Sequence, residues 1–277
     1  MTLRVALIQT RTPASHAGAL EHVAPLISQA AQGGAQLILT PEGTNILQKD
    51  RNRLAPQLTS LEDDPVVQGL RDAAQRLSVS LLIGSALVRR EDGQAANRSA
   101  LISPEGEIIA TYDKLHMFDV DLPNGETARE SAVYTPGDRA VIAQAEGAVL
   151  GLTICYDIRF PALHRALALA GAQILTVPAA FTRPTGEAHW EVLLRARAIE
   201  TGSFVLAPAQ GGFHEDGRGT YGHSLAIAPW GEVLGKLDHD EPGVLFADLD
   251  LDQVAKARAA IPALANAQPF SGPAPLP

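Results

Sequence analysis

The chain has 277 residues, 46% of them hydrophobic, and a formal net charge of −9, a composition typical of a globular protein with a sizeable core. The acidic balance argues against nucleic acid or an anionic membrane as the main partner. A single cysteine excludes an internal disulfide and a cysteine-based zinc cluster, and it fits a reducing compartment. No signal peptide and no run of about 18 apolar residues is found, so we expect a cytoplasmic protein without a membrane span.

Strands and helices alternate in the first half of the chain. Apolar residues at helical spacing predict a helix over 16–32 that ends at two glycines. Acidic cap residues followed by a proline in the first turn predict a second helix over 63–77. The predicted strands are 3–9, 36–40 and 81–88, followed by a hairpin over 97–113 that turns at 104–106.

The second half continues this alternation after an irregular segment. Residues 119–138 lack periodicity and hold prolines and glycines, which is typical of a lid or a binding loop. A polar loop over 182–186 is expected to lead to the strongest helix, 187–201. The other predicted elements are strands over 139–145, 149–154, 173–177, 203–209, 224–228, 233–236 and 244–248, and helices over 161–171 and 251–260. The pattern favours an α/β fold with a mixed sheet, or two sheets, and helices outside.

The lone cysteine, Cys155, stands where a buried strand is expected to give way to a helix. Such a turn can place backbone N–H groups and the positive end of a helix near the thiol. A buried cysteine that acts as a small hydrophobe is the simpler interpretation. The polar residues Tyr156, Asp157 and Arg159 directly after it favour a nucleophile.

A thiol nucleophile needs a base and a group that stabilises developing negative charge. Spacing alone leaves two possibilities open. Glu42 and Lys114 both follow predicted strands, so they could meet Cys155 at one sheet edge. The other possibility is a cysteine–histidine pair, for which the candidates are His116, His164, His189 and His223. No metal-ligand run, glycine-rich phosphate loop or dinucleotide-binding fingerprint is present.

Three separated motifs resemble the nitrilase, or carbon–nitrogen hydrolase, superfamily over essentially the full chain. They are Leu-Thr-Pro-Glu at 39–42, Tyr-Asp-Lys-Leu-His-Met-Phe-Asp at 112–119 and Leu-Thr-Ile-Cys-Tyr-Asp-Ile-Arg-Phe-Pro at 152–161. The resemblance implies a four-layer α-β-β-α sandwich that commonly pairs through helices into homodimers or larger homo-oligomers. It also implies one hydrolase domain over 1–262, which leaves a tail rich in proline and alanine over 263–277.

The same resemblance implies a Glu-Lys-Cys triad and no cofactor. Glu42 corresponds to the general base, Cys155 to the nucleophile, and Lys114 with the backbone N–H of Tyr156 to the oxyanion donors. A further glutamate of many members corresponds to Glu130, which would position the lysine or the substrate.

Three residues outside the triad also have simpler, structural interpretations. Arg159 is expected to bind a substrate carboxylate, because a guanidinium can hold one with two hydrogen bonds, although it could equally be structural. Asp157 could cap the helix that follows it. His116 could bond to a nearby carbonyl.

Within the superfamily, 180–201, 119–123 and Tyr-Gly-His-Ser at 221–224 resemble the Nit subgroup. That subgroup contains ω-amidase and deaminated glutathione amidase, and the sequences of 193–201 and 221–224 look more like the second. The resemblance therefore implies hydrolysis of a small carboxylate-bearing amide through a thioester, with α-ketoglutarate and cysteinylglycine as products. One departure is Gly43-Thr44-Asn45, where many members have a larger apolar or aromatic residue. Because of this departure, the sequence does not determine which acyl group the pocket accepts.

Other functions remain open from the sequence. ω-Amidase, N-carbamoyl amino acid hydrolase and nitrilase are alternatives within the superfamily. A non-catalytic scaffold and a papain-like thiol hydrolase are alternatives outside this mechanism.

Overall fold

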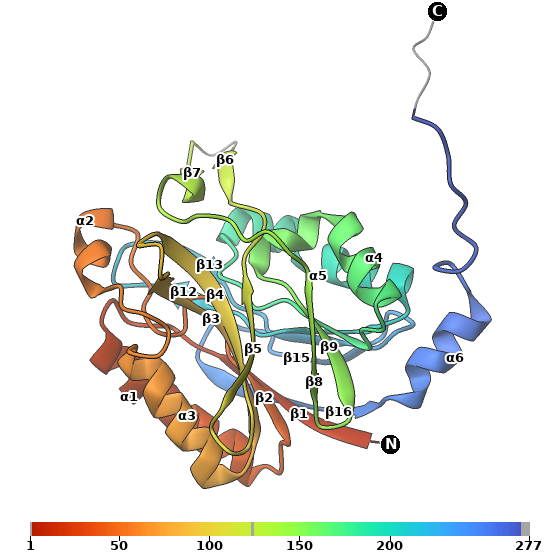
Figure 1. Cartoon of the computed structure of the whole chain (residues 1–277), viewed down its shortest axis with the longest axis horizontal. Helices are drawn as coiled ribbons and strands as arrows, with labels where there is room; N and C mark the ends of the chain where they lie inside the picture. The colour runs from red at the N-terminus through yellow and green to blue at the C-terminus, as the bar shows by residue number, and fades with distance from the viewer. Residues whose placement is uncertain (1, 123–124, 273–277) are drawn as a thin grey trace, which may run out of the picture.

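The computed structural model describes residues 2–122 and 125–272, whose strands form two six-stranded sheets (Figure 1). The first sheet has the order β16 (Gly243–Asp250), β1 (Thr2–Gln9), β2 (Leu37–Leu39), β3 (Ser80–Arg89), β4 (Ala95–Ile102) and β5 (Ile108–Asp113). Strands β1, β2 and β3 are parallel, and the flanking pairs are antiparallel. The first sheet is therefore mixed.

The second sheet has the same plan, with a parallel centre and antiparallel edges. Its order is β15 (Val233–Lys236), β14 (Leu225–Ile227), β11 (Phe204–Ala207), β10 (Ile174–Thr176), β9 (Ala148–Leu152) and β8 (Val141–Ala145). Two small hairpins accompany the sheets: β6 (Asp119–Asp121) with β7 (Thr127–Arg129), and β12 (Gly211–Phe213) with β13 (Gly219–Tyr221).

Two pairs of helices cover the outer faces of the sheets (Figure 1). Helices α1 (His16–Gln32) and α3 (Pro65–Leu77) lie on the first sheet, and α4 (Pro161–Leu169) and α5 (Arg183–Thr201) lie on the second. The shorter helices are α2 (Arg51–Leu54), α6 (Asp252–Ala260) and the 3₁₀ helices η1 (Ala55–Gln57), η2 (Glu130–Ala132) and η3 (Cys155–Arg159). The layers follow as α-β-β-α, so the predicted sandwich is confirmed.

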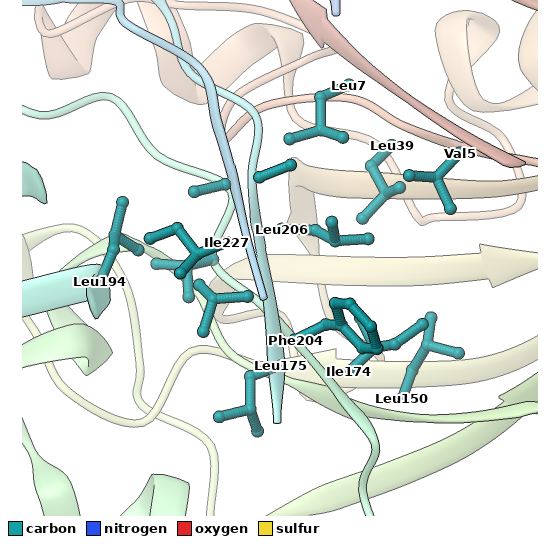
Figure 2. Close-up of a cluster of buried hydrophobic side chains, with 14 of the residues drawn as sticks. Val5, Leu7, Leu39, Leu150, Ile174, Leu175, Leu194, Phe204, Leu206 and Ile227 are labelled. Carbon is teal, nitrogen blue, oxygen red and sulfur yellow. The ribbon is translucent and has the colours of Figure 1, made fainter. Parts of the chain in front are cut away.

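Alternation along β1 shows how the sequence separates these layers. Successive side chains of a strand point to opposite faces, and both faces of β1 are apolar. Val5 and Leu7 belong to the core between the sheets, whereas Ala6 and Ile8 pack with α1 and α3. Figure 2 shows Val5 and Leu7 in one buried cluster with Leu206 of the second sheet. Burying each valine or leucine side chain fully stabilises the fold by about 1.5–3 kcal/mol.

The start of α3 follows from its cap. The carboxylate of Asp64 accepts hydrogen bonds from the backbone N–H groups of Val66 at 2.9 Å and Val67 at 3.0 Å. Pro65 occupies the first turn, where its missing N–H costs nothing. The predicted helix is confirmed, with Asp64 rather than Asp63 as its cap.

Two predictions about segments were wrong. Residues 119–138 do not form one irregular loop, because they contain the β6–β7 hairpin and η2. Residues 182–186 are not a loop, because α5 begins at Arg183 with Pro184 in its first turn. Both segments are polar and lack the apolar periodicity from which a strand or a helix is predicted.

Residues 261–272, which follow α6, project from the body of the molecule (Figure 1). A contact with the body is the hydrogen bond from Arg165 Nη2 to the Leu264 carbonyl at 3.4 Å. The rest of the predicted tail, 273–277, lies outside the described residues, and the division at 262 stays a prediction. No described helix is long and apolar enough to cross a membrane.

Candidate active site

Cys155 opens η3 shortly after the end of β9. The strand ends at Leu152 rather than Ile154, so the expected strand-to-helix turn includes a 3₁₀ helix. The Cys155 backbone has a φ of 48°, which is uncommon for a residue other than glycine, and its N–H donates to the Pro178 carbonyl at 2.8 Å. The side chain is 7% exposed. The thiol thus lies in a nearly closed site at the carboxyl end of a parallel strand.

Lys114, which directly follows β5, forms the centre of a buried charge cluster. Its Nζ lies 2.9 Å from Oε1 of Glu42 and 2.9 and 2.8 Å from the two carboxylate oxygens of Glu130. Glu42 follows β2, and Glu130 opens η2. The structure therefore brings Glu42 and Lys114, which follow strands β2 and β5, together with Glu130 of η2, and the Glu42 carboxylate also contacts the thiol of Cys155.

Two groups that the sequence analysis did not single out complete the cluster. The side-chain amide of Asn97 donates to Glu42 at 2.9 Å and to Glu130 at 3.2 Å. The backbone N–H of Ala180 donates to the other carboxylate oxygen of Glu42 at 2.9 Å. These bonds fix both carboxylates, since a buried carboxylate needs several donors.

The charges of the cluster determine its protonation state. Burial alone lowers the pKa of Lys114, but Glu130 and Glu42 outweigh it and hold this pKa well above its ordinary value. Burial alone raises the pKa of Glu42, but the charge and hydrogen bond of Lys114 outweigh it and lower this pKa. Burial and the neighbouring Glu42 carboxylate raise the pKa of Cys155 well above its ordinary value. At neutral pH the site holds a carboxylate, an ammonium and a neutral thiol.

Arg159 lies at the end of η3 on an aromatic surface. Its guanidinium carbon is 5.5 Å from the centre of the Phe181 ring and 6.0 Å from that of Tyr156. Its Nη2 lies 3.3 Å from Nδ1 of His189. Within 2–122 and 125–272, no carboxylate forms an ion pair with Arg159. The guanidinium therefore keeps hydrogen-bond donors for a ligand.

The sequence profile of the carbon–nitrogen hydrolase family matches residues 4–259. The chain belongs to the carbon–nitrogen hydrolase family. It is 41% identical over 249 residues to the deaminated glutathione amidase of Synechocystis sp., and the alignment covers 88% of this chain and 90% of that protein. It is also 34% identical to the omega-amidase NIT2 of Bos taurus, with 94% of this chain and 93% of that protein covered.

A solved structure agrees with this assignment. The NitFhit protein of C. elegans superposes with a TM-score of 0.89 at 30% identity. The match covers 96% of this chain and 65% of that protein, so this carbon–nitrogen hydrolase spans just under two thirds of its length.

The four histidines considered as bases for Cys155 have other partners in the part of this hydrolase that the structure describes. The contacts are His116 with the Asp157 carboxylate, His164 with the Phe160 carbonyl, His189 with Arg159 and His223 with the Tyr221 carbonyl. The geometry thus favours a carboxylate and an ammonium beside the thiol.

Asp157 and His116 also differ from their simpler interpretations. Asp157 does not cap α4, because its carboxylate accepts the Ile154 N–H at 2.9 Å, at the start of η3. His116 contacts this carboxylate rather than a carbonyl. Among the described residues of this hydrolase, no group of three or more His, Cys, Asp or Glu side chains is arranged to hold a metal ion.

Proposed function

We propose that this carbon–nitrogen hydrolase cleaves deaminated glutathione to α-ketoglutarate and cysteinylglycine through a thioester on Cys155. The observation that carries the chemistry is the buried cluster of Glu42, Lys114 and Cys155. The names of the relatives at 41% and 34% identity support a small amide with a carboxylate as the substrate.

The first step is attack by the thiol. Glu42, which is held ionised next to the thiol, takes the proton while the sulfur bonds to the amide carbon. Lys114 Nζ and the backbone N–H of Tyr156 stabilise the resulting oxyanion. Each such donor is worth about 3 kcal/mol of transition-state stabilisation. Glu42 then returns the proton to the leaving amine, the C–N bond breaks, and the acyl group remains as a thioester.

The second step is hydrolysis of the thioester. Glu42 takes a proton from water, and the water oxygen bonds to the acyl carbon. The C–S bond breaks, the proton returns to the sulfur, and the acid is released. The raised pKa of Cys155 supports this order, because the sulfur is a neutral thiol between turnovers.

Glu130 and Arg159 have supporting roles in this proposal. Glu130 accepts hydrogen bonds from Lys114 Nζ at both carboxylate oxygens and thus holds the ammonium in position to stabilise the oxyanion. Arg159 binds the substrate carboxylate, because the described residues offer it aromatic rings and a histidine but no acid.

A substrate panel tests the proposal. The purified protein is given deaminated glutathione, α-ketoglutaramate, an N-carbamoyl amino acid and a simple nitrile, and the released acid, cysteinylglycine and ammonia are measured. We expect the highest kcat/KM for deaminated glutathione and no turnover by Cys155→Ala. A preference for α-ketoglutaramate would identify an ω-amidase instead, and turnover of the nitrile alone would contradict the amidase assignment.

A further inference from the structure

The carboxylate of Asp157 is completely buried two residues after Cys155. A buried carboxylate is costly unless donors surround it. Its Oδ2 accepts the Tyr112 hydroxyl at 2.7 Å and the Ile154 N–H at 2.9 Å. Its Oδ1 contacts the His116 backbone N–H at 3.1 Å and the His116 ring nitrogen Nδ1 at 2.6 Å. One side chain thus gathers four donors.

These donors come from both sides of the active site. Tyr112 lies two residues before Lys114 at the end of β5, and His116 lies two residues after it. Ile154 directly precedes Cys155 after β9. Because β5 and β9 belong to different sheets, Asp157 ties the segment that carries the ammonium to the turn that carries the thiol.

His116 also contacts the far end of the nucleophile turn. Its ring stacks on Phe160, with centroids 3.5 Å apart and planes 7° from parallel. Phe160 directly follows η3. His116 therefore holds the turn at two points, by a hydrogen bond to Asp157 and by its flat face against Phe160, while its own side chain stays 29% exposed.

The backbone of Cys155 requires such support. A φ of 48° costs conformational free energy in a non-glycine residue and persists only where the surroundings enforce it. Cys155 N–H bonds to the Pro178 carbonyl and Asp157 N–H to the Ile154 carbonyl, whereas Tyr156 N–H has no carbonyl partner among the described residues. Holding this turn keeps the Tyr156 N–H available for an oxyanion.

We propose that Asp157 and His116 form a positioning pair that holds the turn of Cys155 in register with Lys114. The inference rests on the roles proposed above for Cys155 and Lys114. Neither Asp157 nor His116 touches the reacting atoms. They act on the rate by fixing the distance between the sulfur, the Tyr156 N–H and the ammonium.

The test compares two substitutions of one partly exposed side chain. His116→Ala removes both the Nδ1 contact and the stacked ring, whereas His116→Asn retains an N–H donor near the position of Nδ1. We expect His116→Ala to lower kcat by about 10- to 100-fold with KM little changed, and His116→Asn to recover part of kcat. His239→Ala, at an exposed histidine elsewhere, is the matched control and should leave kcat unchanged.

Alkylation of Cys155 separates positioning from loss of folded protein. Iodoacetamide is titrated against each variant, so that kcat is expressed per reactive thiol. We expect His116→Ala and Tyr112→Phe to keep a full count of reactive thiols but to alkylate more slowly, in step with the lower kcat. Tyr112→Phe removes one donor to Asp157 while leaving the buried carboxylate in place, so the test needs no substitution of Asp157 itself.

Two results would overturn the pair while leaving the proposed function intact. One is that the wild type is active and that His116→Ala and Tyr112→Phe have the same kcat and the same alkylation rate as the wild type. The other is a loss of kcat that disappears once it is expressed per reactive thiol. A wild type that hydrolyses no amide would instead contradict the proposed function itself.

Discussion

Lys114 is the buried cation that both Glu42 and Glu130 contact, so we expect a change at this one residue to affect catalysis and stability together. Lys114→Met keeps most of the side-chain volume but leaves two largely buried carboxylates unpaired. We expect kcat to fall by about 10²–10³-fold, as for loss of an oxyanion donor. We also expect the free energy of unfolding to fall by about 3–5 kcal/mol, as for a broken buried pair. Steady-state kinetics and urea unfolding measure the two effects.

The matched control for this change is Lys256→Met. Lys256 is 72% exposed and lies 3.7 Å from Asp250, so its ion pair is screened by water. Both kcat and the unfolding midpoint should stay at their wild-type values. Equal losses in the two variants would show that the effect belongs to lysine substitution in general rather than to the buried cluster.

Glu42 makes stability depend on pH in a defined direction. Its pKa is lowered in the folded protein, so the stability it contributes is present above the ordinary glutamate pKa of about 4.3 and is lost as the pH falls through the lower folded value. Glu42→Gln has no proton to bind there. We expect the free energy of unfolding to decline less steeply in Glu42→Gln than in wild type between about pH 5 and pH 2. Parallel declines in urea titrations would contradict the lowered pKa.

Asn97 shows why one site residue could not be found from the sequence. A hairpin over 97–113 that turns at 104–106 pairs Asn97 with Asp113. In the structure a bulge between β4 and β5 shifts the register, so that Arg98 pairs with Asp113 and the Lys114 N–H bonds to the Asn97 carbonyl. A slip of one residue reverses the face of every side chain. The sequence motifs singled out Glu42, Lys114 and Cys155, but only the bulge places Asn97 beside Glu42.

At the scale of elements, the β6–β7 hairpin supports Glu130. Asp119 at its base accepts the Ser131 N–H at 3.0 Å, and the Phe118 N–H donates to Glu130 Oε2 at 2.6 Å. Asp121, by contrast, makes an exposed ion pair with Arg129 farther along the hairpin. The base of the hairpin therefore fixes η2, whereas the outer pair contributes little.

This arrangement predicts different effects for two substitutions on one hairpin. Asp119→Ala should loosen η2 and lower kcat by about tenfold, because small displacements of a positioning group are costly to the rate. Asp121→Ala should change kcat by less than about twofold and the free energy of unfolding by less than about 1 kcal/mol. Kinetics with deaminated glutathione measures both. A larger loss of kcat in Asp121→Ala would mean that the whole hairpin, rather than its base, controls Glu130.

The elements that the sequence predicted are those with a strong apolar period. The helix over 16–32 and the strand over 233–236 have the predicted bounds. The helix begins after its cap residue Ser15 and ends before Gly33-Gly34, and the strand follows a turn that contains Gly231. The short strands β12 and β13 were missed, since each has three residues and glycines form half of the pair. Strands of this kind are held by their surroundings rather than by their own propensity.

At the scale of the whole molecule, the site exists only where the two sheets meet. Glu42 and Lys114 follow strands of the first sheet, and Cys155 follows a strand of the second. The core between the sheets, part of which Figure 2 shows, therefore sets the distance between the proposed base and the proposed nucleophile. Glu42, Lys114 and Cys155 follow three different strands, so no single hairpin or helix contains all three side chains. For this reason the three motifs are far apart in the sequence.

The outer face of α5 carries apolar side chains that no described residue of this chain covers. Val192 is 70% exposed, Ile199 is 55% exposed, and Trp230 nearby is 54% exposed. Val192 and Ile199 are seven residues apart and therefore share one face of α5, and Ile199 lies against Gly231, the neighbour of Trp230 in the chain. Large exposed apolar surfaces in a globular protein commonly mark sites of association.

We therefore predict that the protein forms a homodimer through this face of α5. Ile199→Asp places a charge in the contact and should shift the sedimentation coefficient from that of a dimer to that of a monomer, while the circular dichroism spectrum stays unchanged. Ile109→Asp is the matched control, because Ile109 is 48% exposed on β5, away from α5, and its substitution should leave the dimer intact. A wild type that sediments as a monomer at micromolar concentration would contradict the homodimer, and a dimer that persists in Ile199→Asp would place the contact elsewhere on the molecule.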